Sequence, residues 1–394
     1  MQYIQKKNPD KYFLAILALF IVPISGVSID IYVPSLPQVS HFFGVDKSIV
    51  QLTITAYTLG LGLMQIFAGP VSDSFGRRKP FLISMSIFII TTLMIPWSHT
   101  IHQLLLLRFI QGAMVAATVV PMRSVIADLF EGQAYYKMMT YMTNAWSIGP
   151  IIAPAIGGYL QHYIGWQANF YFLAIYGIIG LALIWIYMPE TSMHIHPFNL
   201  REIFQRYRSI LFNKKFISSV TMNGFLYTCI LLFAVLGPFL IQTMMHYSAV
   251  QFGHMALLTG LAWFLGTVIN RILIHIPLEE KSTYCLWTML IIALAMLGLS
   301  FVYALNIYVI LIPVLMLLLV GGIAFPNYFA RGVALFPQAT GSSNALFGSA
   351  IFLISSVGSA FAVLLKSTSS LPLAAAYVGL VVVCLIIHSI ELKS

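Results

Sequence analysis

The chain has 394 residues, of which 60% are hydrophobic and only 8% are charged. A soluble domain carries roughly 25% charged residues, so this composition excludes an ordinary soluble fold and indicates an integral membrane protein. One helical span takes about 20 apolar residues, and about twelve spans with short connections account for the whole length. The net charge of +9 does not indicate a nucleic-acid partner, because the basic residues fall in the gaps between apolar runs.

The first apolar run extends from Tyr12 to about Val33 and follows three lysines. It is too long for the apolar core of a signal peptide, so it predicts a retained first helix. Further apolar runs, bounded by charged or turn residues, complete two sets of six spans. The spans are expected near residues 12–34, 48–70, 80–97, 102–126, 137–160 and 167–188, and near 216–242, 250–274, 283–302, 306–330, 342–365 and 371–390.

The longest polar segment separates the two sets of spans. Within it, apolar residues recur at helical spacing opposite arginines, which predicts an amphipathic helix on the inner membrane surface. These residues are Ile203, Phe204, Tyr207, Ile210 and Leu211. A calmodulin-like or nucleic-acid site is the sharper alternative. We therefore expect an all-α membrane protein with twelve transmembrane helices: a six-helix bundle at 1–188, a cytoplasmic linker at 189–215 and a second six-helix bundle at 216–394.

Lysine and arginine concentrate in alternate connections between the predicted spans, and the side that receives most of them is the cytoplasmic side. This distribution predicts a multi-pass protein of a bacterial-type inner membrane with both termini in the cytoplasm. The cytoplasmic group is Lys6, Lys7, Lys11, Arg77, Arg78, Lys79, Arg123, Lys137, Arg201, Arg206, Arg208, Lys214, Lys215, Arg271, Lys281, Arg331 and Lys393, and the opposite group is Lys47 and Lys366.

Two charges fall deep inside predicted spans: Asp30 in VPISGVSIDIYVPSLP and Arg108 in LLLLRFIQG. A charge at the centre of a membrane helix costs roughly 2.5 to 3.5 kcal/mol, and such charges face a cavity or mark a substrate or proton path. We hypothesise that Asp30 carries a coupling proton and contacts the substrate or competes with it, with Arg108 as a structural or proton-relay partner. A static polar pair that stabilises helix packing is the alternative.

Aromatic and amide side chains inside the spans are candidates for the lining of a cavity. They suit an amphipathic, cationic ligand, although ordinary packing is the alternative for each of them. The candidates are Tyr32, Tyr57, Asn144, Trp146, Asn223, Phe225 and Tyr227.

The segment GPVSDSFGRRKP after the second span resembles the signature loop of the major facilitator superfamily, with matches at Gly69, Asp73, Gly76, Arg77 and Arg78. This resemblance implies a gate on the inner side. A carboxylate is favoured beside a helix amino terminus, so Asp73 is expected near the helix that starts at GSSNALFG, and Asp128 is expected as the counter-charge of Arg77. A plain insertion signal is the alternative, but it leaves the acid and the glycines unexplained.

Other segments resemble the drug:proton antiporter branch of that superfamily, with twelve helices, and its Bcr/CflA-type members in particular. The fourth span carries Arg108, Gln111 and Gly112, and the fifth carries IGPIIAPAIGG, which includes Pro150, Pro154, Gly157 and Gly158. The small residues and prolines of the fifth span suit a close interface between the two halves, with generic helix packing as the alternative. The resemblance extends over the whole chain through four further segments: IDIYVPSLP, PET at 189–191, GPFLIQ and the segment at 321–348.

The resemblance departs from the family pattern after the eighth span. GTVINRILIHIPLEEK keeps Asn270 and Arg271 but lacks the acid and the Gly-Arg-Arg of the signature loop, so a second inner gate is expected to be weaker. The weak echo between PMRSVIADLFEG and FARGVALFPQATG fits parallel six-helix repeats. The resemblance thus implies two six-helix bundles related by pseudo-twofold symmetry.

The function that the resemblance implies is a proton-coupled secondary transporter, an antiporter that exports drugs or small amphipathic metabolites by alternating access. It implies a monomer in the lipid bilayer whose ligands are protons and a small molecule, without cofactor, metal or nucleic acid. One rival is an importer of an organic solute such as an iron chelate, in which Arg108 binds an anionic substrate. A receptor that transports nothing is another, and an enzyme is disfavoured because no catalytic motif is visible.

Overall fold

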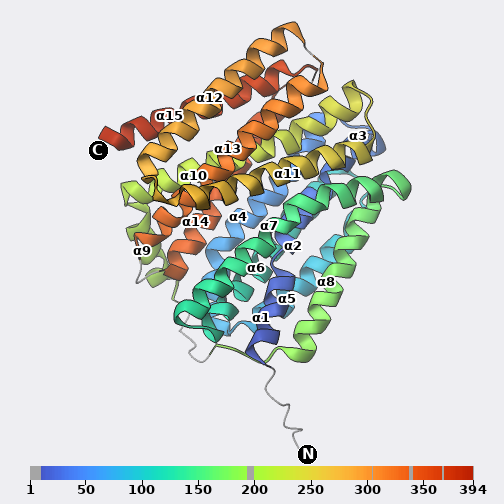
Figure 1. The fold of residues 1–394 in the computed structure, drawn as a ribbon. Coiled ribbons are helices and arrows are strands. Elements are labelled where there is room, and N and C mark those ends of the chain that lie inside the picture. Colours follow the sequence, from blue (N-terminus) through green and yellow to red (C-terminus); the bar gives the residue numbers. More distant parts are fainter. Residues whose placement is uncertain (1–9, 193–198, 304, 337–339, 366–367, 394) are drawn as a thin grey trace, which may run out of the picture.

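The computed structural model describes residues 10–192, 199–303, 305–336, 340–365 and 368–393. Lys6, Lys7 and Lys366 of the charge distribution, and residues 193–198 of the predicted linker, lie outside the described residues. All regular elements of the described part are helical, and most run side by side along one direction (Figure 1). Eleven helical segments in it are long and apolar enough to cross a membrane. The predicted all-α membrane fold is therefore confirmed.

The first span is longer than predicted and is interrupted. It consists of α1 (Lys11–Ile21), α2 (Ile24–Asp30), a 3-10 turn (Val33–Ser35) and α3 (Leu36–Phe43). Pro23, Pro34 and Pro37 have no backbone N–H and cannot continue the helical hydrogen-bond ladder, which explains the interruptions. Asp30 is therefore the last residue of a short helix rather than a position inside a continuous one.

The remaining helices are long and are joined by short connections. They are α4 (Lys47–Phe75), α5 (Arg78–Met94), the 3-10 turn Ile95–Trp97, α6 (Ile101–Leu129), α7 (Gly132–Tyr163), α8 (Gln167–Tyr187), α9 (Leu200–Leu211), α10 (Lys214–Pro238), the π-helical turn Phe239–Met244, α11 (Ala249–Ile272), the 3-10 turn Leu273–His275, α12 (Leu278–Val302), α13 (Ile307–Ala334), α14 (Thr340–Val363) and α15 (Leu371–Lys393).

Helix α7 contains the predicted fifth span but is not among the eleven apolar segments of the described chain. Its amino-terminal half, GQAYYKMMTYMTNAWS, is rich in hydroxyl and amide groups, and Thr140 and Asn144 are exposed. With its 32 residues α7 is long enough to span a bilayer, and it packs along α11. It completes a set of twelve long helical segments.

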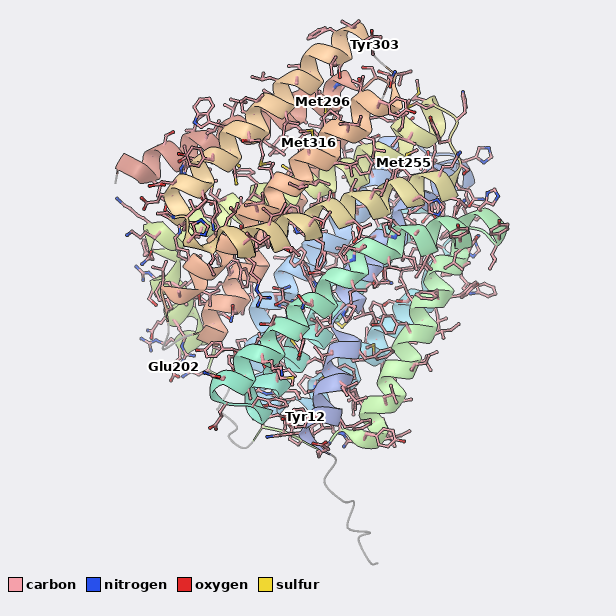
Figure 2. The ribbon with its side chains drawn as sticks, in the orientation of Figure 1. Tyr12, Glu202, Met255, Met296, Tyr303 and Met316 are labelled. Atoms are coloured by element: carbon pink, nitrogen blue, oxygen red, sulfur yellow. The ribbon has the colours of Figure 1, made fainter. Side chains whose placement is uncertain are left out.

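The two ends of the molecule can be told apart by the elements found there. Figure 2 shows Tyr12 and Glu202 at one end, where α9 lies, and Tyr303 and Met255 toward the opposite end, where α3 lies. We call these the α9 end and the α3 end. Helices of the first half (α1 to α8) meet those of the second half (α10 to α15) mainly where α4 packs on α14 and α7 on α11.

Candidate functional site

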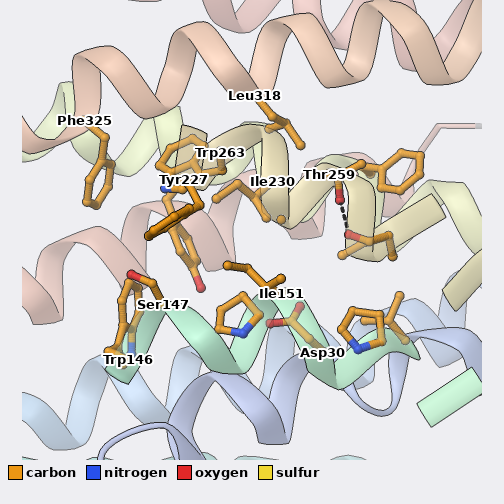
Figure 3. Close-up of a pocket in the computed structure, with 18 of the residues that line it drawn as sticks. Asp30, Trp146, Ser147, Ile151, Tyr227, Ile230, Thr259, Trp263, Leu318 and Phe325 are labelled. Carbon is orange, nitrogen blue, oxygen red and sulfur yellow. Dashed lines mark hydrogen bonds between the residues drawn. The ribbon is translucent and has the colours of Figure 1, made fainter. Parts of the chain in front are cut away.

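A cavity lies between the two halves, with α2 and α7 on one side and α10, α11 and α13 on the other (Figure 3). It offers about 70 Å³ to the centre of a water molecule. One water needs roughly 10–15 Å³ measured in the same way, so the cavity has room for several waters or for part of a small ligand. Its lining is mostly apolar and aromatic and includes Asp30, Trp146, Ser147, Pro150, Ile151, Tyr227, Phe233, Phe252, Thr259, Trp263, Phe264, Leu318 and Phe325.

Among the described residues that line the cavity, Asp30 is the one that is acidic or basic. Helix α2 ends at Asp30 because the 3-10 turn and Pro34 follow it, and Figure 3 shows the carboxylate among the labelled lining residues Ile151, Ile230 and Thr259. No hydrogen bond or ion pair links this carboxylate to another described residue. An ionised carboxylate without a partner in apolar surroundings is costly, so the site gains free energy when a proton or a cationic group binds there.

Arg108 lies inside the first half and does not line the cavity. Its side chain is fully buried, and Nη1 donates to the carbonyl of Ser28 at 3.1 Å and to Oε1 of Gln111 at 2.6 Å. Gln111 in turn donates to the hydroxyl of Thr92 at 2.8 Å. None of the ion pairs in the described part of the chain joins Arg108 to Asp30. Ser28 and Asp30 are two positions apart on α2 and point to different sides of it, which separates the two charges.

Two of the predicted cavity residues enclose Arg108 instead. The guanidinium carbon lies 4.4 Å from the ring centre of Tyr57 and 5.1 Å from that of Tyr32, within cation–π range. Both tyrosines are fully buried. The phenol of Tyr57 donates to the carbonyl of Ser25 at 2.9 Å, which fixes α4 against α2. These tyrosines lie against the cation and are not part of the cavity lining.

The other predicted cavity residues divide into two groups. Trp146 and Tyr227 line the cavity, and the indole N–H of Trp146 donates to the hydroxyl of Ser25 at 3.1 Å. Asn144, Asn223 and Phe225 do not line it. Asn144 is exposed on α7, Phe225 is half-buried against the core, and Asn223 is fully buried with neither amide atom hydrogen-bonded to a described residue.

The second half contributes aromatic lining that the sequence interpretation missed. Trp263, Phe264 and Phe325 look like ordinary membrane residues in a chain that is 14% aromatic. One signal in the sequence could have identified Trp263. Tryptophan concentrates at membrane interfaces, whereas Trp263 lies well inside α11. A tryptophan in the interior of a span is thus a better candidate for a cavity than the phenylalanines around it.

The fifth-span motif forms close contacts of α7 with its neighbours. Pro150 lines the cavity, and a Cβ on Gly253 of α11 would lie 2.6 Å from the carbonyl oxygen of Pro154. A Cβ on Gly158 would lie 2.5 Å from the carbonyl oxygen of Ala249, whereas Gly157 packs against the backbone of α2 in its own half. These small residues let α7 approach α11 closely on the α3 side of the cavity.

The α3 end is closed by two glutamines that donate across the halves. Gln51 of α4 donates to the carbonyl of Val235 at 2.8 Å, and Gln242 of the π-helical turn donates to the carbonyl of Pro34 at 3.0 Å. Both acceptors lie beside irregular backbone, the first just before Pro238 and the second in the 3-10 turn. The exposed amino-terminal half of α7 lies on the other side of the cavity.

The signature loop forms a network at the α9 end. Arg77 donates to Asp128 at 3.0 Å and to Asp73 at 2.5 Å. Burial disfavours the charged form of Arg77, but the hydrogen bonds to Asp128 and Asp73 outweigh it and raise its pKa. Asp73 was expected near the amino terminus of α14, yet in the described residues it pairs with Arg77 and makes no hydrogen bond to α14. The glycine of the motif that faces α14 is Gly69, close to Ala345.

Glu190 is a further member of this network that the sequence interpretation did not single out. Its carboxylate accepts the backbone N–H of Arg77 at 2.7 Å and that of Arg78 at 3.2 Å, so it caps the start of α5. The carboxylate occupies the space beside Gly76, which has a φ of +84° and no side chain to block it. The motif Pro-Glu-Thr at 189–191 was the available signal.

The fourth-span motif holds α6 against α4. Gln111 belongs to the Arg108 cluster, and Gly112 packs directly against the backbone carbonyl of Tyr57. A side chain at Gly112 would push α4 away from α6. It would thereby disturb the ring of Tyr57, which covers Arg108.

Comparisons with known proteins agree with this architecture. The chain matches the Major Facilitator Superfamily over residues 18–359. It is 27% identical over 384 residues to a bicyclomycin resistance protein homolog of Haemophilus influenzae, which covers 94% of this chain and 93% of the relative. It is 28% identical over 225 residues to the multidrug transporter MdfA of Yersinia pestis bv. Antiqua, covering 57% of this chain and 55% of that protein.

A solved structure shares the fold. The D-xylose-proton symporter superposes with a TM-score of 0.78 at 15% identity, covering 96% of this chain and 97% of the symporter. The motif matches, the helical segments and these comparisons lead to one conclusion: the chain belongs to the Major Facilitator Superfamily and is a multi-pass membrane transporter of small molecules rather than an enzyme.

Proposed function

We propose that this protein is a proton-coupled antiporter that exports drugs or small amphipathic metabolites by alternating access. The observation that carries the proposal is the Asp30 carboxylate in a cavity between the two halves, without a partner among the described residues. Secondary transporters of this architecture bind substrate near the midplane and expose the site to each side in turn as the halves rock.

The proposed cycle follows from the cost of leaving Asp30 ionised and unpaired. A proton or the cationic group of a substrate relieves this cost, but the single carboxylate has room for one of them at a time. Release of the proton on the inner side and binding of substrate there are therefore coupled. The membrane potential supplies roughly 2.3 kcal/mol per charge per 100 mV for the return of the proton.

The cavity lining favours an amphipathic substrate. Trp146, Tyr227 and Trp263 offer ring faces that attract cations and apolar groups. The bicyclomycin-resistance and multidrug relatives support export of drug-like compounds.

The proposal includes an orientation and a domain division. The positive-inside distribution supports a cytoplasmic α9 end, with both termini on the inner side of a bacterial-type inner membrane. The halves correspond to 1–188 and 216–394, with the linker at 189–215 between them. We propose that the monomer is the transporting unit, since the cavity is formed by a single chain.

The test is proton-driven transport in proteoliposomes. Asp30→Asn is expected to abolish drug accumulation driven by a pH gradient, because an amide cannot exchange the coupling proton. Asp46→Asn, which neutralises the exposed N-cap of α4, is the matched control and is expected to retain transport. Full proton-driven accumulation by Asp30→Asn would refute the coupling role.

The rival functions lack a supporting contact. Import of an organic anion bound by Arg108 requires that Arg108 reach the cavity, but it is enclosed by Tyr32 and Tyr57 within the first half. Uptake of a labelled iron chelate by growing cells would support import as the function. A receptor that transports nothing predicts no substrate-linked proton flux in the same vesicles.

A further inference from the structure

Helix α9 is joined to the second half of the molecule by a short connection. The side chain of Asn199 accepts the backbone N–H of Arg201 at 3.1 Å and caps the start of α9. Asn213 accepts the backbone N–H of Phe216 at 3.1 Å and caps the start of α10. The connection between the two helices is Phe212 and Asn213 alone, so α9 stays close to the start of α10.

One face of α9 touches the first half. Tyr207 is 6% exposed, Ile210 is 1% exposed, and the phenol of Tyr207 donates to the carbonyl of Ile66 in α4 at 2.9 Å. This carbonyl lacks its usual helical donor because the residue four positions later is Pro70. Burial raises the pKa of Tyr207 to about 12, so the phenol remains a donor at neutral pH. Helix α9 thus tethers α4 to the second half.

The opposite face of α9 is exposed and combines aromatic, apolar and basic side chains. Phe204, Arg208 and Leu211 share a side of the helix at i, i+4 and i+7, with Arg201 and Phe212 beside them. Phe204 is 71% exposed and Phe212 is 75% exposed, and the guanidinium carbon of Arg208 lies 5.5 Å from the ring centre of Phe212. We call these five residues the outward face of α9.

Both charges on the outward face are positive. The one acid of α9, Glu202, accepts a hydrogen bond from the side chain of Asn199 at 2.8 Å. The third arginine of α9, Arg206, donates to the hydroxyl of Ser342 in α14 at 3.5 Å. Aromatic rings beside guanidinium groups, on a helix next to the ends of membrane spans, fit the bilayer interface: the rings enter the acyl boundary and the guanidinium groups bind phosphates.

We propose that the outward face of α9 binds the headgroups of anionic phospholipids, and that this binding holds α9 against α4 and strengthens the tether between the halves. The binding does not depend on the proposed transport function, whereas its effect on the transport cycle rests on it. The lipid composition of the facing leaflet then regulates how readily α4 separates from the second half.

Hydrogen exchange of the full-length protein in nanodiscs tests the binding. The discs contain phosphatidylcholine alone or mixed with phosphatidylglycerol, and the exchange of the α9 backbone amides is compared between them. Phosphatidylglycerol is expected to slow this exchange, and a basic residue near an anionic surface contributes roughly fivefold in binding. The double variant Arg201→Gln/Arg208→Gln is expected to lose the response, and added salt is expected to weaken it in the wild type.

The matched control is Arg206→Gln, which removes the same charge from the side of α9 that faces Ser342. It is expected to keep the response to phosphatidylglycerol. The proposal is overturned if phosphatidylglycerol does not slow exchange in the wild type, or if the control loses the response as completely as the double variant. Unchanged exchange in α12 and α15 verifies that each variant is folded. Because no substrate or pH gradient is present, the result does not depend on the role of Asp30.

Discussion

At the scale of single residues, the two deep charges differ in the partners that surround them. Nη1 of Arg108 has two hydrogen-bond acceptors, and the guanidinium lies within cation–π range of Tyr32 and Tyr57, so its burial is compensated in part inside the first half. Nε and Nη2 make no hydrogen bond to a described residue. Asp30 has no such partner among the described residues and faces the cavity. The first charge is therefore suited to a structural role, and the second to exchange of a proton or a ligand.

This difference predicts that replacing Arg108 lowers stability and that replacing Asp30 hardly changes it. Arg108→Leu leaves the buried Oε1 of Gln111 without its donor, which costs about 1–3 kcal/mol of unfolding free energy. Asp30→Asn removes no hydrogen bond to a described residue and is expected to leave the thermal unfolding temperature in detergent nearly unchanged. A large loss of stability in Asp30→Asn, or none in Arg108→Leu, would reverse the assignment of roles.

At the scale of helices, the sequence was informative about the positions of the spans and less so about their irregularities. Apolar runs bounded by charges locate the spans because each must cross the same hydrocarbon thickness. The break after α1 and the extension to α3 were missed, although Pro23 and Pro37 are visible in the sequence. Prolines are tolerated in membrane helices when neighbouring groups satisfy the freed carbonyls, and those neighbours are known only from the fold.

Pro70 and Tyr207 provide a test of this principle. Tyr207→Phe removes the donor to the carbonyl of Ile66 and is expected to cost about 0.5–1.5 kcal/mol of stability. In a Pro70→Ala background the backbone N–H of residue 70 can donate to the same carbonyl, so the cost of Tyr207→Phe is expected to shrink. Equal costs in both backgrounds, measured by thermal unfolding in a double-mutant cycle, would contradict this account of the tether.

At the scale of the whole molecule, the site depends on how the two halves meet. Three features of the first half were candidates from the sequence: the charge of Asp30, the aromatic Trp146 and the proline-glycine motif of α7. All of them lie at or beside the cavity. The lining from α11 and α13 was not predicted, because Trp263 and Phe325 come together with Asp30 only after segments more than 200 residues apart pack against each other. Hydropathy alone does not encode that packing.

The glutamines at the α3 end test how the closed end is held. Gln51→Leu and Gln242→Leu each remove one hydrogen bond between the halves, worth about 1 kcal/mol, so each is expected to shift the population toward an open α3 end by roughly fivefold. Spin labels at Phe42 and Tyr303, one in each half near that end, report the change as a longer distance. Unchanged distance distributions in the double variant would show that other contacts keep this end closed.

The central claim is that a proton and a cationic substrate compete for the carboxylate of Asp30, and proton release on ligand binding measures this directly. Tetraphenylphosphonium, a lipophilic cation, is added to the purified protein in weakly buffered detergent, and the pH change is recorded. The account predicts that the wild type releases protons as the cation binds and that Asp30→Asn releases none. Binding without proton release by the wild type, or equal release by the variant, would contradict it.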